Sequence, residues 1–155
     1  MIMETDVKNS RYYLNRELSW LQFNKRVLQE AVDTSNPLLE KLKFLAITSS
    51  NLDEFFMIRV AGLKHQKENG VKRRDIANMT STEQLENISD ACQKLVAQQY
   101  MHLKGILKEL ETEGLVFIKP ADADERQKQW MGNYFEREIF PVVTPMAVDS
   151  SHPFP

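Results

Sequence analysis

The sequence is poor in glycine and proline, the two residues that most often interrupt helices. Five glycines and six prolines in 155 residues are little more than half of the usual share. The glycines are widely spaced, at positions 62, 70, 105, 114 and 132. The motifs GxGxxG and GxxxxGK[ST], which bring closely spaced glycines against phosphate, are therefore absent. A nucleotide site in this chain would have to be built differently, and the composition favours helices.

Cysteine, net charge and long apolar runs are also scarce. The single cysteine, Cys92, excludes an internal disulfide, a zinc finger and a CxxC pair, which favours a reducing compartment. The formal net charge of −2 provides no global positive field for nucleic acid or an anionic membrane. No apolar run approaches the roughly 20 residues that cross a bilayer, and the N-terminus lacks the apolar core of a signal peptide. We expect a cytoplasmic protein without a transmembrane segment.

Helical periodicity is what the sequence has in abundance. Residues 16–33 predict a first helix with a wide buried face, formed by Trp20, Leu21, Phe23, Val27, Leu28, Ala31 and Val32. A longer pattern begins at Thr80 and Glu83, which have capping-box spacing, and ends at Gly114. Its apolar stripe predicts one helix of about 33 residues, which at 1.5 Å each would be about 50 Å long. Such a helix favours an antiparallel bundle or a connecting arm.

Between these two segments lies a second helical pattern that is interrupted by polar residues. Asn36 and Pro37 predict its start, with Asn36 as the capping side chain. The polar triplet at 48–50 follows, and Asn51 with Glu54 again has capping-box spacing. We therefore expect a break or kink at 49–51, followed by a new helix and then a polar loop at about 64–80.

The pattern changes after Gly114. The run LVFIK at 115–119 predicts a buried strand, Asp122 and Glu125 predict a helix start, and FPVVTPMAV at 140–148 predicts a second strand. Two short strands need further strands to form a stable sheet. We expect a helical domain at 1–113 and, at 114–155, the truncated beginning of an α/β domain.

Few residues form a constellation that could carry chemistry. His65, His102 and His152 are scattered and include no HxxxH or HExxH pair, so neither a catalytic residue nor a metal ligand is assigned to them. Cys92 lies on the apolar stripe of the long helix, where core packing is the favoured interpretation and a reactive thiol the alternative.

Charged residues near the middle of the chain suggest structural roles. Asp53 and Glu54 are adjacent and would point about 100° apart on a helix, so first-turn placement is favoured over a shared ligand. The basic run at 72–74, with Lys64 and Lys67 nearby, could attract a polyanion, but solvated surface is the favoured interpretation. The net charge and the lack of interleaved aromatic residues argue against nucleic-acid binding.

Asn51 is the most informative polar residue. Its amide offers a donor and an acceptor side by side, the complement of an adenine edge. The same oxygen could cap a helix that begins at Leu52, and Asn is among the preferred N-cap residues. From the residues alone the cap is favoured, and the base contact is the alternative.

The segments RYYLNRELSWLQFNKRVLQEA and NPLLEKLKFLAITSSNLDEFFMIRVAGLKHQ resemble the N-terminal region of bacterial polyphosphate kinase. The resemblance is strong from residue 12 to about 67 and looser through the long helix. It returns in FPVVTPMAVDSSHPFP, which is similar to the family's entry into its second domain. Only the first eleven residues lie outside it.

The resemblance implies an enzyme that reversibly transfers the terminal phosphoryl group of ATP to inorganic polyphosphate, through a phosphohistidine and with magnesium. In the family the catalytic histidine and metal ligands lie in C-terminal domains, so no catalytic or metal role is carried over to this chain. The asparagine of the family's NLDEF motif contacts adenine, and that residue is Asn51 here. The resemblance therefore favours the base contact.

Several expectations follow from this resemblance. We expect the 155 residues alone to be inactive, to bind no cofactor of their own, and to contribute to a homo-oligomer in the longer enzyme. Peripheral membrane association of that enzyme is left open. The alternative is a non-enzymatic helical module that docks a protein partner through the helix at 16–31.

Overall fold

The computed structural model describes residues 9–148 and 151, and every regular element within them is helical. A single turn of 3-10 helix, Ser10–Tyr12, comes first. The first unit then contains α1 (Arg16–Glu30), α2 (Leu38–Glu54), the π-helical segment η2 (Phe55–Val60), α3 (Ala61–Glu68) and α4 (Ser81–Thr112). The second contains α5 (Glu125–Tyr134), a π-helical turn at Phe135–Ile139, and two 3-10 turns, Pro120–Asp122 and Phe140–Val142. The protein is mainly α, as the composition predicts.

Contacts within the chain form two compact units that meet between Leu115 and Val116. The predicted domain division, 1–113 and 114–155, lies next to this point. It stays a prediction, since independent folding is what establishes a domain. No helix in the described part of the chain is both long and apolar enough to span a membrane.

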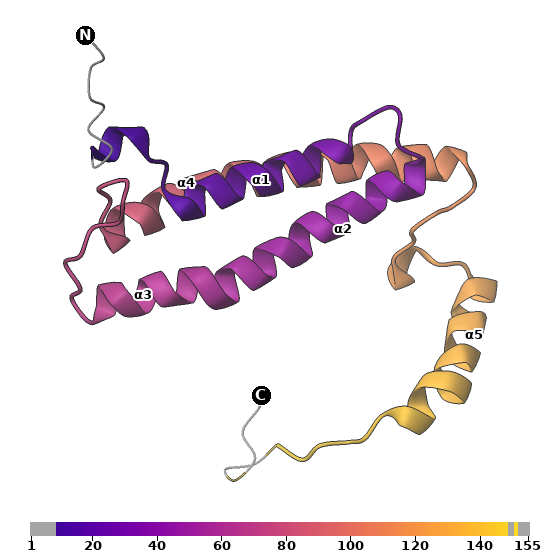
Figure 1. Ribbon diagram of the computed structural model, residues 1–155. Coiled ribbons are helices and arrows are strands. Elements are labelled where there is room, and N and C mark those ends of the chain that lie inside the picture. The colour runs from indigo at the N-terminus through magenta and orange to yellow at the C-terminus, as the bar shows by residue number, and fades with distance from the viewer. Residues whose placement is uncertain (1–8, 149–150, 152–155) are drawn as a thin grey trace. The chain divides into compact units, whose positions relative to one another are not determined.

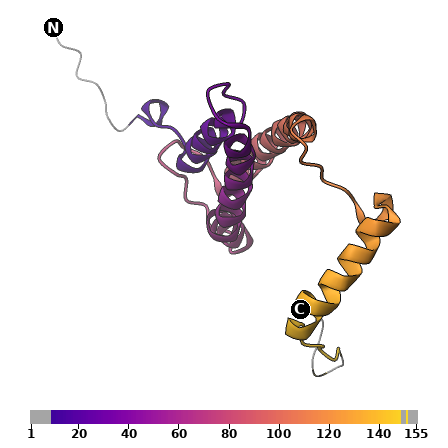
Figure 2. The ribbon, with the colours of Figure 1, turned by 90° about the vertical axis from the view of Figure 1, so that its right-hand side faces the viewer.

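The first unit is a bundle in which α1, the continuous helix 38–68 and α4 lie side by side (Figures 1 and 2). A short turn joins α1 to α2, and a loop joins α3 to α4, so that α1 and α4 both run antiparallel to helix 38–68 (Figure 1). The antiparallel bundle with one long helix is thus confirmed. The segments 31–37 and 69–80 connect helices that are antiparallel neighbours.

Local signals set the ends of the helices. The Asn15 side chain accepts a hydrogen bond from the backbone N–H of Leu18 at 2.9 Å and begins α1. Thr80 and Glu83 form the predicted reciprocal capping box of α4, which has 32 residues and is followed by Gly114 with a φ of +86°. Asn36 differs from the prediction: its side chain donates to the carbonyl of Glu30 at 2.8 Å, so it satisfies the end of α1 instead of capping α2.

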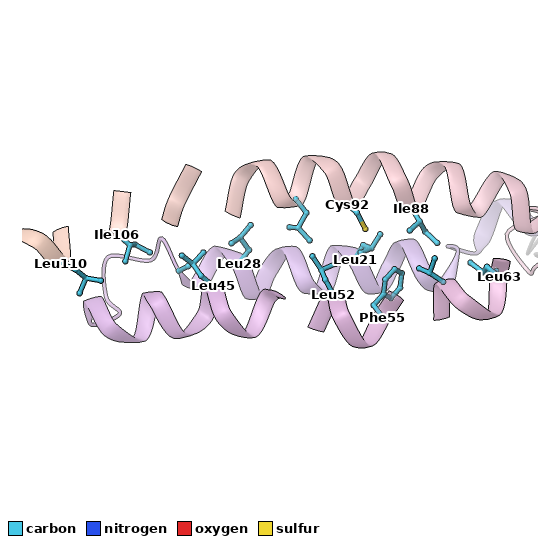
Figure 3. Packing of buried hydrophobic residues seen from close by; sticks show 13 residues of the cluster. Leu21, Leu28, Leu45, Leu52, Phe55, Leu63, Ile88, Cys92, Ile106 and Leu110 are labelled. Carbon is cyan, nitrogen blue, oxygen red and sulfur yellow. The ribbon is translucent and has the colours of Figure 1, made fainter. Parts of the chain in front are cut away.

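Apolar side chains from all three helices of the bundle form one core (Figure 3). The buried members are Leu21, Leu28, Ala31, Leu45, Leu52, Phe55, Val60, Leu63, Ile88, Cys92, Leu95, Ile106 and Leu110. On α1 the buried face is narrower than predicted, because Phe23 and Val32 are exposed and the polar Asn24 is buried in their place.

The predicted break at 49–51 is wrong, because α2 continues through these residues. The polar side chains of Thr48, Ser49 and Asn51 bond to partners that leave the helix backbone intact. Thr48 Oγ1 donates to the carbonyl of Phe44 at 2.8 Å. Ser49 Oγ accepts from Gln99 of α4 at 2.7 Å, and Asn51 bonds to α1. Tertiary partners thus engage Ser49 and Asn51, and these two side chains do not compete with the backbone as such residues do in an isolated helix.

The helix does change its geometry, but at 55–60, where it becomes π-helical. Buried residues of helix 38–68 recur at intervals of three or four up to Phe55, and the next one, Val60, comes five residues later. A π turn, with its i→i+5 hydrogen bonds, places Phe55 and Val60 on the same face. The wider turn therefore keeps the buried stripe directed at the core.

The second unit corrects the predicted strand-helix-strand order. Neither 115–119 nor 140–148 forms a strand in the described residues, where most of these apolar side chains are exposed. An apolar run becomes a strand only when a neighbouring backbone pairs with it, and in the described part of the chain these segments have no such neighbour. The predicted helix is present as α5, but Asp124 and Gln127 form its capping box, in place of Asp122 and Glu125.

Two adjacent phenylalanines provide a test of this packing. Phe55 is 1% exposed and stacks on Trp20 with ring centroids 4.5 Å apart, whereas Phe56 is 42% exposed. We expect Phe55→Ala to lower the free energy of unfolding by about 3–5 kcal/mol, since it leaves a cavity in the core. The control, Phe56→Ala, loses mainly an edge contact and is expected to cost about 0.5–1.5 kcal/mol. Urea unfolding followed by circular dichroism measures both, and equal losses would contradict the assigned register.

Candidate functional site

Asn51, the one residue predicted to contact a substrate, lies inside α2, three residues before its end. The capping interpretation is wrong, because α2 begins at Leu38 and the backbone N–H groups after Asn51 already bond within the helix. The same holds for Asp53 and Glu54, which are exposed near the end of α2 and not in a first turn. The side chain of Asn51 is partly exposed and is therefore available for another role.

Two consecutive hydrogen bonds connect the Asn51 side chain through Asn24 to the backbone of α2. Its Nδ2 donates to Oδ1 of Asn24 on α1 at 2.9 Å. Asn24 is 0% exposed, and its own Nδ2 donates to the backbone carbonyl of Thr48 at 3.1 Å. The Thr48 carbonyl can only accept a hydrogen bond, so the direction of both bonds in this Asn51–Asn24–Thr48 network is defined.

The network leaves a donor and an acceptor of Asn51 open. A carboxamide has two N–H donors, and Asn24 takes one of them. Oδ1 of Asn51 accepts no hydrogen bond from the described residues. It is also solvent-accessible, since every buried side-chain oxygen and nitrogen in the described part of the chain has a partner. One N–H and one C=O therefore remain for an adjacent donor and acceptor on a ligand.

A second interhelical cluster lies next to this network, around η2. Glu17 of α1 is buried and accepts hydrogen bonds from Arg16 at 2.7 Å and from Arg59 of η2 at 3.0 Å. The Arg59 guanidinium lies 5.7 Å from the centre of the Trp20 ring, which in turn stacks on Phe55. The ion pair and the stacked rings hold η2 against α1 just beyond Asn51.

Asn24, Glu17 and Arg59 were not predicted as parts of a site. Asn24 could have been found, because it lies between Leu21 and Leu28 on the buried stripe of α1, where a polar residue needs an internal partner. The pairing of Glu17 with Arg59 has no comparable signal, since it depends on how two helices far apart in the sequence align.

The histidines do not form a site in the described residues. His65 is exposed on α3, His102 is partly buried on α4, and neither imidazole has a hydrogen-bond partner within the described part of the chain. His152 lies outside the described residues. Among residues 9–148 and 151, no three His, Cys, Asp or Glu side chains are grouped closely enough to hold a metal ion.

The basic loop is partly committed to structure. Arg74 donates to the carbonyl of Asn78 at 2.6 Å and pairs with Glu83 at 3.2 Å, so it braces the start of α4. Lys72 and Arg73 are exposed, as are Lys64 and Lys67 on α3. This arrangement agrees with the favoured interpretation, a solvated basic surface.

Comparison with known proteins identifies the family of this chain. Residues 13–118 match the family model described as the polyphosphate kinase N-terminal domain, and residues 126–155 match the polyphosphate kinase middle domain. The chain is 50% identical over 151 residues to a polyphosphate kinase from Synechocystis and 48% identical over 152 residues to one from Mycobacterium tuberculosis. These alignments cover 97% of this chain.

A solved structure supports the same assignment. The crystal structure of polyphosphate kinase from Porphyromonas gingivalis matches with a TM-score of 0.61 and 29% identity, over 87% of this chain and 20% of that one. The chain belongs to the polyphosphate kinase family. It spans about a fifth of the length of the curated relatives that it matches.

The reactivity of the Cys92 thiol tests whether this residue lies in the core. Cys92 is 6% exposed, and burial raises the pKa of its thiol to about 11. The nucleophilic thiolate is then rare at pH 8, so we expect Ellman's reagent to react with the folded chain at least about tenfold more slowly than with the chain in urea. Equal rates would assign Cys92 to the surface and contradict its place in the core.

Proposed function

We propose that this chain is the N-terminal part of an enzyme that reversibly transfers the terminal phosphoryl group of ATP to inorganic polyphosphate. Within that enzyme the chain supplies an adenine contact through Asn51 and an assembly surface for a homo-oligomer. The phosphohistidine and the magnesium ligands belong to other parts of the enzyme. The 155 residues alone are inactive. We place the enzyme in the cytoplasm.

The adenine contact is proposed because the Asn51 amide uses only one of its N–H donors within the described residues. Adenine presents a donor and an acceptor side by side at N6 and N7, and a carboxamide pairs with both at once. Oδ1 and the remaining N–H of Asn51 offer this complement at the surface of a well-packed helix. Membership of the polyphosphate kinase family supplies the reason to expect a nucleotide here.

The rest of the chain suits base recognition and not phosphoryl chemistry. It has neither glycine-rich phosphate-binding motif. The described residues gather no set of side chains suited to a magnesium ion, so no metal-dependent step is assigned to them. Catalysis of phosphoryl transfer depends on charged groups that clamp the phosphates and the metal. These groups are expected outside this chain.

One observation favours the alternative, a helical module for protein interaction. Phe56, Met57 and Ile58 of η2 are 42%, 72% and 65% exposed, so three consecutive apolar side chains reach solvent, although outside the helix at 16–31 that was predicted to dock a partner. Under this alternative Asn51 only joins α2 to α1, and its substitution would lower stability without changing the affinity for any nucleotide.

A chimera tests the proposal, with this chain in place of the matching region of the Synechocystis enzyme. We expect ATP-dependent polyphosphate synthesis by the chimera. We expect Asn51→Ala to raise its KM for ATP about 5- to 150-fold, the range that corresponds to loss of a base contact worth about 1–3 kcal/mol. The control is Ser50→Ala, because Ser50 is exposed and has no side-chain hydrogen bond in the described residues.

Each part of the proposal can fail separately. An unchanged KM for ATP in the Asn51→Ala chimera would show that Asn51 does not contact adenine. A stable phosphoenzyme formed from ATP by the 155 residues alone would contradict their inactivity. Nuclear magnetic resonance of the labelled 155-residue chain adds a direct readout, since a preformed adenine pocket gives ATP-dependent shifts near Asn51 that Asn51→Ala abolishes.

A further inference from the structure

Asn24 is a fully buried carboxamide that touches no solvent and yet bonds directly to Asn51. It lies between α1 and α2, with Leu21 and Leu28 on the same buried face. Its Nδ2 donates to the Thr48 carbonyl and its Oδ1 accepts from Asn51, so both ends of the amide are used. A residue that is buried, polar and satisfied in this way has one orientation, since a flipped amide would place its oxygen against the Thr48 carbonyl.

The fixed orientation of the Asn24 amide also fixes that of the Asn51 amide. Because Oδ1 of Asn24 can only accept, the group that Asn51 turns toward it must be the NH2 group. Oδ1 of Asn51 is then directed away from Asn24. Without Asn24, the terminal torsion of the Asn51 side chain would have broad, roughly two-fold freedom and could present either end of its amide to a ligand.

We propose that Asn24 is a positioning residue that fixes the orientation of the Asn51 amide and thereby makes the site prefer adenine to guanine. The inference rests on the adenine contact of the proposed function. An oriented amide pairs with adenine, which has a donor beside an acceptor. Guanine has two acceptors, N7 and O6, on the corresponding edge, so the fixed oxygen of Asn51 would meet one of them. A freely rotating amide can turn a donor toward guanine and loses this discrimination.

The test measures ATP and GTP affinities of the chimera with three substitutions. Asn24→Leu removes the amide and is near in volume. We expect ATP to bind about 2- to 10-fold more weakly, the range for ordering one freed side chain. We expect GTP to bind at least as well as before, since the freed amide can turn a donor toward guanine. The ATP/GTP preference therefore falls. A loss of protein stability alone would weaken the binding of both nucleotides equally and leave the ATP/GTP preference unchanged.

Asn24→Asp is the conservative control. In its protonated form, which burial favours, it accepts from Asn51 and donates to the Thr48 carbonyl, so we expect it to keep most of the ATP/GTP preference. Asn51→Ala separates this inference from the adenine contact itself. If Asn51→Ala weakens the binding of ATP while Asn24→Leu keeps the ATP/GTP preference, Asn24 does not position Asn51, and the adenine contact stands. If Asn51→Ala has no effect on ATP, both are wrong.

Nuclear magnetic resonance of the unsubstituted 155-residue chain gives a second readout that needs no nucleotide. One of the two protons of the Asn51 side-chain amide should be protected from solvent exchange by its bond to Asn24. Asn24→Leu should remove this protection. Two equally unprotected protons in the unsubstituted chain would overturn the inference.

Discussion

The bundle depends on one constraint, the need to satisfy a carboxamide that is buried between two helices. Asn24 is enclosed, and an unpaired amide at such a position costs free energy that the surrounding apolar contacts do not return. Its partners, Thr48 and Asn51, lie on the facing helix. A slip of one residue would move them by 1.5 Å and rotate them by about 100°, breaking both bonds. The apolar layer alone tolerates several registers, whereas the amide permits one.

Two further contacts extend this register to the start of the π turn. Glu17 lies seven residues before Asn24 on α1. Arg59, the partner of Glu17, lies eight residues after Asn51 on the opposing helix. The stacked pair of Trp20 and Phe55 lies between them, four residues from each member of the amide pair. Glu17 lies three residues before Trp20 and Arg59 four residues after Phe55, spacings that keep each residue on the contacting face of its helix. The wider turn of η2 serves the apolar face instead, where the buried Val60 follows Phe55 at an interval of five.

Several patterns that concern one helix at a time were predictable from the sequence, and the contacts between helices were not. The capping box at Thr80 and the glycine at 114 define α4 locally, and they set its ends as predicted. Asn51 also has the spacing of a cap, but its amide bonds to α1, and tertiary contacts override the local signal. The run at 115–119 has strand-like composition and forms no strand in the described residues, because composition does not supply a pairing partner.

The same distinction applies to the candidate site. Its exposed residue was found through a motif, and its buried support was not, although a polar residue on the apolar stripe of α1 was a visible signal. Under the proposed function this division has a physical meaning. One amide contributes little affinity in comparison with the charged contacts that hold a triphosphate, but its direction decides which base fits. A nearly neutral helical bundle with a rigid amide in its interface is suited to selecting the nucleotide, while its binding strength and reactivity depend on charges elsewhere in the enzyme.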